Sequence, residues 1–144
     1  MPTASYVKVT SANEDLAEGI NSGTDQWAVA LSSAAPGSKV FTSGTTDLAT
    51  SGGYIAGGAN VSTTSSGMNG SDFILVLADP AVWTASGGGF TFRYALLVNK
   101  TVLQGAQGTV VGYWDYGSAQ VVASGETVIV DLDQTATIGV FKIT

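Results

Sequence analysis

The chain contains no histidine and no cysteine among its 144 residues. Without an imidazole it lacks the usual general base at neutral pH and the commonest metal ligand, and without a thiol it forms no disulfide or Cys-ligated zinc site. Ser-His-Asp and Cys-His catalysis within one chain are therefore excluded. The sequence also has no Gly-x-Ser-x-Gly elbow and no Gly-x-x-x-x-Gly-Lys-Ser/Thr phosphate loop. We expect a non-enzymatic protein that uses no cofactor and no metal.

Charge is scarce as well. Charged residues make up 11% of the chain, five basic against eleven acidic, for a net charge of −6. An acidic chain is poorly suited to neutralising a phosphate backbone, so we expect no nucleic-acid partner. No apolar run approaches the roughly 20 residues that span a bilayer, so we expect no membrane partner either. A surface with few charges loses little solvation energy when another protein covers it, which favours a component of an assembly.

Short segments rich in β-branched and aromatic residues predict strands, and turn-forming Gly, Pro, Asn and Ser separate them. The predicted strands are residues 6–10, 26–31, 72–78, 90–98, 109–115, 127–132 and 137–143. The connections are too short for repeated crossover helices. The pattern predicts a single all-β domain over residues 1–144, an antiparallel β-sandwich or jelly-roll-like barrel. Residues 32–70, rich in Gly, Ser and Thr, are predicted to form long loops.

One stretch has a helical pattern. Ser11 and Glu14 have capping-box spacing, and Leu16, Ala17 and Ile20 could form one buried face over one or two helical turns. The alternative is an exposed loop that carries the acidic residues of this segment. At most one short helix is therefore expected.

Arg93, the only arginine, lies in the predicted strand 90–98. Alternation of side chains along this strand puts Arg93 on the face opposite to Phe90, Phe92, Tyr94, Leu96 and Val98. If the strand pairs antiparallel with residues 109–116, Arg93 comes opposite Trp114 or Asp115, depending on the register. We predict an Arg93–Asp115 ion pair that helps to fix the register. A role in ligand binding is the less favoured alternative.

Paired carboxylates are the remaining catalytic possibility, because glycosidases need only two. Asp131 and Asp133 lie two residues apart near the end of a predicted strand and so project from one face, with Asp115 and Glu126 nearby in sequence. Solvated surface charge is the favoured reading of such a pair. The calcium-binding pattern of an EF-hand loop is absent.

Aromatic residues gather at Tyr113, Trp114 and Tyr116, while Trp27 and Trp83 stand elsewhere. Exposed aromatic rings stack on sugars or anchor protein interfaces. Core packing is the alternative expected for at least half of these residues.

An ordered series of segments covers much of the chain, namely residues 25–31, 53–58, 83–88, 92–97, 112–118 and 124–127, followed by the closing strand. Together these segments resemble small virion structural proteins of tailed bacteriophages and prophages. The resemblance implies a non-enzymatic particle protein, a capsid decoration or cement protein bound to the outside of the major capsid shell. A tail, adaptor or fibre-base protein is the nearest alternative, and a carbohydrate-binding module is the alternative from another class.

This resemblance predicts two partners, the major capsid protein and copies of the chain itself. Copies on a symmetric shell meet at its symmetry axes, so a homotrimer is the expected assembly. Residues 1–10 are a candidate arm for a neighbouring chain, since Tyr6, Val7 and Val9 are apolar and Pro2 favours an extended backbone. An edge strand of the same domain is the alternative. With Tyr113, Trp114 and Tyr116, these are the candidate partner contacts.

Overall fold

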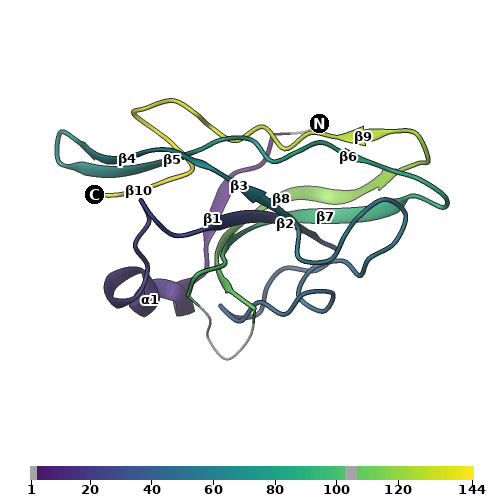
Figure 1. Ribbon diagram of the computed structural model, residues 1–144, viewed down its shortest axis with the longest axis horizontal. Helices are drawn as coiled ribbons and strands as arrows, with labels where there is room; N and C mark the ends of the chain where they lie inside the picture. The colour runs from purple at the N-terminus through teal and green to yellow at the C-terminus, as the bar shows by residue number, and fades with distance from the viewer. Residues whose placement is uncertain (1–2, 103–106) are drawn as a thin grey trace.

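The computed structural model describes residues 3–102 and 107–144, and Figure 1 labels its elements. A five-stranded sheet has the order β1 (Tyr6–Lys8), β8 (Thr109–Val122), β7 (Phe90–Asn99), β2 (Trp27–Ser32), β3 (Ala59–Val61). A three-stranded sheet has the order β10 (Phe141–Ile143), β5 (Asp72–Leu77), β4 (Thr63–Asn69). A two-stranded sheet pairs β6 (Trp83–Thr84) with β9 (Thr127–Val128). Every pairing is antiparallel, and the sheets pack in a sandwich-like arrangement, which confirms the predicted all-β class.

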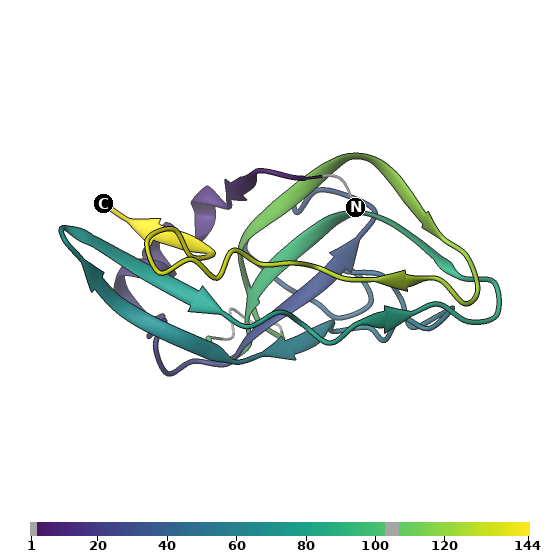
Figure 2. The same cartoon turned by 90° about the horizontal axis from the view of Figure 1, so that it is seen from above.

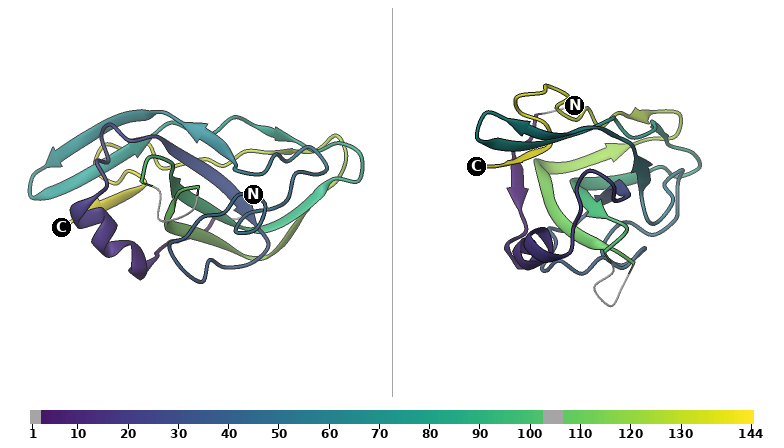
Figure 3. Two further views of the ribbon diagram at one scale, coloured as in Figure 1. Left: turned by 60° about the horizontal axis from the view of Figure 1, so that its bottom comes forward. Right: turned by 60° about the vertical axis from the view of Figure 1, so that its left-hand side comes forward.

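The central part of the five-stranded sheet is buried on both faces. One face packs against the two smaller sheets, which lie above it in Figure 1, and Trp27, Leu77 and Phe92 are fully buried between them. The other face is covered by the first helical residues and by Phe41, which pack on Leu96 and neighbouring side chains. Figure 3 shows the helix and the loops below the sheet from two further directions. The buried apolar side chains on both faces supply most of the favourable energy of folding.

Strands with a mostly apolar sequence agree closely with their predictions. The strands β2, β5 and β7 begin and end within one residue of the predicted bounds. By contrast, β8 runs on to Val122, whereas the predicted strands 127–132 and 137–143 shorten to β9 and β10. The loop prediction for residues 32–70 is wrong in part, because β3 and β4 both lie there. Ser, Thr and Gly form β4 even though they carry little apolar signal.

The predicted alternation along β7 is wrong at its centre. Phe90 and Phe92 face the smaller sheets, whereas Tyr94, Leu96 and Val98 belong to the opposite core cluster. The register between β7 and β8 shifts between Phe92 and Tyr94, so that a bulge reverses the faces on which the side chains lie.

The N-terminal segment is the edge strand of the same sheet. β1 pairs with β8, with Tyr6 opposite Trp114, and the Val9 amide then donates to the Val111 carbonyl at 2.9 Å. The arm interpretation is therefore wrong for residues 6–9, and the edge-strand alternative is confirmed for them. The first two residues of the proposed arm, Met1 and Pro2, lie outside the described residues.

A short helix follows β1, as predicted. A 3-10 turn η1 (Thr10–Ala12) leads into α1 (Asn13–Glu18), but no side chain caps the helix. The capping-box prediction is wrong, because Ser11 Oγ instead accepts a hydrogen bond from the Lys39 amide at 2.9 Å. The predicted buried face is also rotated, since Ala17 is exposed while Asp15 is buried, 2.8 Å from Lys39 Nζ. In the described part of the chain, neither helical segment has the length and apolar character to cross a membrane.

A candidate binding groove

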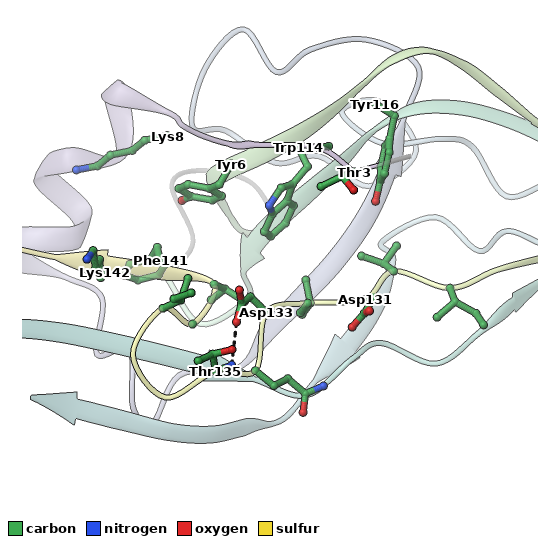
Figure 4. Close-up of a pocket in the computed structure, with 18 residues that line it drawn as sticks. Thr3, Tyr6, Lys8, Trp114, Tyr116, Asp131, Asp133, Thr135, Phe141 and Lys142 are labelled. Atoms are coloured by element: carbon green, nitrogen blue, oxygen red, sulfur yellow. Dashed lines mark hydrogen bonds between the residues drawn. The ribbon is translucent and has the colours of Figure 1, made fainter. Parts of the chain in front are cut away.

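An open groove of about 1290 Å³ lies between β1 and β8 on one side and the C-terminal segment 129–142 on the other (Figure 4). It forms where the two larger sheets end side by side without pairing. β1 is the last strand of the five-stranded sheet, and β10 is the last strand of the three-stranded sheet. Its lining includes Tyr6, Trp114 and Tyr116 on one wall, and Ile129, Asp131, Asp133, Ile138 and Phe141 on the other.

Aromatic rings form the β1–β8 wall. Tyr6 and Trp114 are directly opposite each other in the strand register, and their rings meet edge to face with centroids 5.3 Å apart. Tyr116 lies two residues beyond Trp114 and rests edge to face on Phe92 at 5.7 Å. Burial raises the pKa of both Tyr6 and Tyr116, so that both hydroxyls stay neutral. The wall is therefore a row of uncharged, partly exposed rings.

A glycine makes room for this row. Gly112 lies opposite Lys8 in the register, and a Cβ atom added there would lie 2.2 Å from the ring of Tyr6. Only a residue without a side chain lets the Tyr6 ring rest directly on β8. Because this contact fixes the position of the Tyr6 ring, Gly112 helps to define the β1–β8 wall of the groove.

The opposite wall alternates in burial although it is not part of a sheet. Val130 and Leu132 point into the core, whereas Ile129, Asp131 and Asp133 are exposed. A hydrogen bond from the Leu132 amide to Asp79 Oδ1 at 2.8 Å ties this segment to the body of the protein.

The structure therefore brings Asp131 and Asp133 to the same groove, from the same side of the segment. Asp133 Oδ1 accepts a hydrogen bond from the Thr135 amide at 2.8 Å, which closes a local turn. Two isoleucines flank the carboxylates, Ile129 with 55% and Ile138 with 53% of its surface exposed. Large apolar side chains this exposed are candidates for contact with another molecule.

The predicted partner contacts separate into three groups. Tyr6, Trp114 and Tyr116 come together in the groove. Tyr113 lies on the opposite face of the sheet, edge to face with Tyr94 at 5.9 Å, and Val7 is 41% exposed but does not line the groove. Val9 is buried at 7% exposure, so its prediction as a partner contact is wrong; its side chain completes the second core cluster instead.

The predicted ion pair between Arg93 and Asp115 is present, away from the groove. Arg93 Nε lies 2.8 Å from Asp115 Oδ1, and Arg93 Nη2 lies 3.1 Å from Oδ2. The predicted register is wrong, however, because Asp115 is opposite Tyr94 while Arg93 lies in the bulge. The bond from Arg93, together with the Gly117 amide, holds the pKa of the Asp115 carboxyl below its usual value.

A buried polar network around Asp47 was not predicted. The Tyr54 hydroxyl donates to Asp47 Oδ2 at 2.6 Å and accepts from the Leu31 amide at 3.0 Å. The amides of Gly57 and Gly44 donate to the same carboxylate at 2.7 and 2.6 Å. Burial, followed by the bond to Asp47, raises the pKa of Tyr54. The network fastens the loop before β3 to β2, and no sequence motif signals it.

One further prediction concerns the tryptophans. Trp27 and Trp83 are buried, so the core-packing alternative is confirmed for them. Across residues 3–102 and 107–144, no three acidic side chains gather in a group that could hold a metal ion.

Comparison with known proteins found no matching family model, curated protein or solved structure.

Proposed function

We propose that the chain is a structural component of a tailed-phage particle, a capsid decoration protein that binds the outside of the major capsid shell. The sequence resemblance supports the particle, and the groove supports the mode of binding. The observation that carries the proposal is the pair of half-exposed isoleucines, Ile129 and Ile138, beside the aromatic wall. Such a surface is suited to binding another molecule by burying apolar area, not to catalysing a reaction.

Burial of the apolar side chains in the groove would contribute to the free energy of binding. Fully burying an isoleucine side chain contributes about 1.5–3 kcal/mol, and the half-exposed Ile129 and Ile138 retain a fraction of that. The partly exposed aromatic rings add area with little loss of side-chain entropy, because they are already held against one another. Large anchors of this kind dominate protein interfaces.

An extended segment of the shell protein fits this groove. Such a segment would lie along the groove between β1 and β10 and bind through its side chains, without adding a strand to either short edge. The aromatic and isoleucine side chains would then receive alternate side chains of that partner. The net charge of −6 keeps the protein from competing for the packaged DNA.

A binding assay with particles that lack the protein tests the proposal. Wild-type protein should co-sediment with such particles, whereas the Ile138→Asp variant should lose binding, because a charge would have to be desolvated in the contact. Val82→Asp is the matched control, since Val82 is also about half exposed, at 51%, and lies outside the groove. Equal binding by Ile138→Asp and wild type would contradict the role of the groove.

The particle location separates the decoration role from the tail, adaptor and fibre-base roles. All of these would use the same kind of apolar groove. Co-sedimentation with tailless capsids supports decoration, whereas co-sedimentation only with isolated tails supports one of the alternatives. The predicted homotrimer is tested by the mass of the isolated protein.

A carbohydrate-binding module is the second candidate, and one observation favours it. The aromatic wall faces Asp131 and Asp133 across the groove, and sugar sites combine ring stacking with carboxylate acceptors for hydroxyl groups. Trp27 and Trp83 are buried, so Trp114 should report binding in a fluorescence titration with neutral oligosaccharides. A saturable change that Trp114→Phe removes would support this candidate, and no change would reject it.

A further inference from the structure

The edge strands of the two larger sheets differ in length and charge. The edges β1, β3 and β10 are three residues long. In addition, β1 carries Lys8 and β10 carries Lys142. Short edges and lysine side chains are the usual means by which proteins prevent a sheet from pairing with another molecule. Three of the four edges are therefore protected.

The fourth edge, β4, has neither form of protection. It is seven residues long, and residues 62–71 include no charged residue and no proline. Every residue from Thr64 to Asn69 is exposed, and Met68 is 67% exposed. The bulge at its start, between Thr63 and Ser65, leaves regular pairing with β5 over the rest of the strand. A long, uncharged and regular edge is a template for a further strand.

The position of β4 leaves this edge open to a partner. β4 and β5 form a hairpin whose tip makes one end of the molecule, at the left of Figures 1 and 2. β5 lies between β4 and β10, so the other side of β4 pairs with no strand of the described residues. The hairpin turn at Gly70 has a φ of 62°, which glycine adopts without strain, so the tip is a regular turn.

We propose that β4 pairs antiparallel with β4 of a second copy of the chain, about a two-fold axis. Such a contact joins the two three-stranded sheets into one continuous sheet. An edge with no charge is compatible with its own antiparallel image, whereas each copy as a whole carries −6 and repels the other. The contact thus forms at an edge strand that carries no charge in an acidic protein.

This inference is independent of the proposed place in the phage particle, because it is drawn from the strand edges alone. It differs from the homotrimer expected from the sequence. Two-fold pairing gives an assembly of two copies, so the two expectations predict different masses.

Substitution of Gly67 tests the contact. Gly67 is exposed within β4, and a Cβ atom built there would have no atom within 4 Å, so a side chain fits without disturbing the monomer. Gly67→Lys places two like charges together across the axis and should convert a dimer into a monomer in light-scattering measurements. Gly67→Thr adds a side chain of high strand propensity without charge and should keep the dimer. Thermal unfolding checks that both variants fold.

Cysteine cross-linking provides a second test, because the chain has no cysteine of its own. Opposed residues of antiparallel strands have Cα atoms about 4.5–5.5 Å apart, within the range that a disulfide spans. A cysteine at one of positions 65, 66 or 67 should therefore cross-link two copies under mild oxidation. Gly88→Cys is the control, since Gly88 is exposed, with no atom near its Cβ, and lies outside β4.

The outcomes separate the inference from its alternatives. A wild-type mass of two copies, lost in Gly67→Lys and kept in Gly67→Thr, supports it. A monomer at every concentration, a mass of three copies, or a dimer unchanged by Gly67→Lys overturns it. A monomer whose β4 amides become protected from exchange only on added capsids also overturns it, and assigns the edge to a different protein. The masses by themselves do not decide whether the protein decorates a capsid.

Discussion

Arg93 and Asp115 are joined by a bidentate contact across a bulge, with Nε 2.8 Å from Oδ1 and Nη2 3.1 Å from Oδ2. The same carboxylate accepts a hydrogen bond from the Gly117 amide at 2.8 Å. Asp115 therefore holds both strands at the point where the β7–β8 register shifts between Phe92 and Tyr94. The bond stabilises an irregularity rather than a regular register.

Removing the Asp115 charge should lower stability in a pH-dependent way. The pKa of Asp115 is lowered in the folded protein, so its contribution is fully present above the unfolded value of about 3.9 and is lost as the pH falls through the lower folded value. Asp115→Asn should therefore melt slightly below wild type at pH 7. The difference should shrink as the pH falls below about 4, because the wild-type carboxyl then becomes protonated. Thermal melts from pH 2 to pH 7 measure it.

The size of this difference is expected to be small, because both side chains are more than one third exposed. High salt should reduce it further through screening. A difference between Asp115→Asn and wild type that grows toward low pH would contradict the ion-pair account.

The Tyr54–Asp47 bond should contribute more, because it is buried. Tyr54→Phe leaves the Leu31 amide without its acceptor and removes the hydroxyl donor 2.6 Å from Asp47. A buried group that loses its partner costs about 1–3 kcal/mol. Urea unfolding should therefore show a loss of about that size. Tyr116→Phe is the control, since the described residues provide no hydrogen-bond partner for the Tyr116 hydroxyl, and it should change stability much less.

Gly112→Ala should displace the Tyr6 ring. The new Cβ would lie 2.2 Å from ring atoms at the mobile end of the Tyr6 side chain, so the ring must move away from β8. We expect faster hydrogen exchange of the β1 amides and weaker binding in the groove, with the rest of the fold unchanged. Gly88→Ala, where the added Cβ has no atom within 4 Å, is the matched control. Unchanged exchange in β1 would show that Tyr6 does not depend on Gly112.

The sequence predicts the strands of the core well and the irregular features poorly. Residues 90–98 are mostly apolar or aromatic, and β7 matches them because its second half, from Ala95 to Asn99, is buried on both faces. The reversal of faces at Arg93 was missed, because a bulge depends on the partner strand and leaves no local pattern. β4 was missed because its Ser, Thr and Gly residues resemble a loop in composition.

The sequence did not predict the groove, although it singled out some residues of both walls, including Asp131 and Asp133. Tyr6, Trp114 and Tyr116 stood out as aromatic residues, and strand pairing brings them together. Ile129 and Ile138 carried no distinguishing signal, because an isoleucine in a β-rich chain is usually buried. Their exposure follows from tertiary structure, since Val130, Leu132 and Val140 take the neighbouring core positions. Tertiary contacts of this kind are not encoded in local periodicity.

A cryo-electron microscopy reconstruction of the intact particle would test directly whether the chain binds the outside of the capsid shell through its groove. We expect density for this chain on the outer surface of the shell, with the groove that holds Trp114 and Ile138 turned toward the major capsid protein. Density confined to the tail, or a chain on the shell whose groove faces solvent, would contradict it.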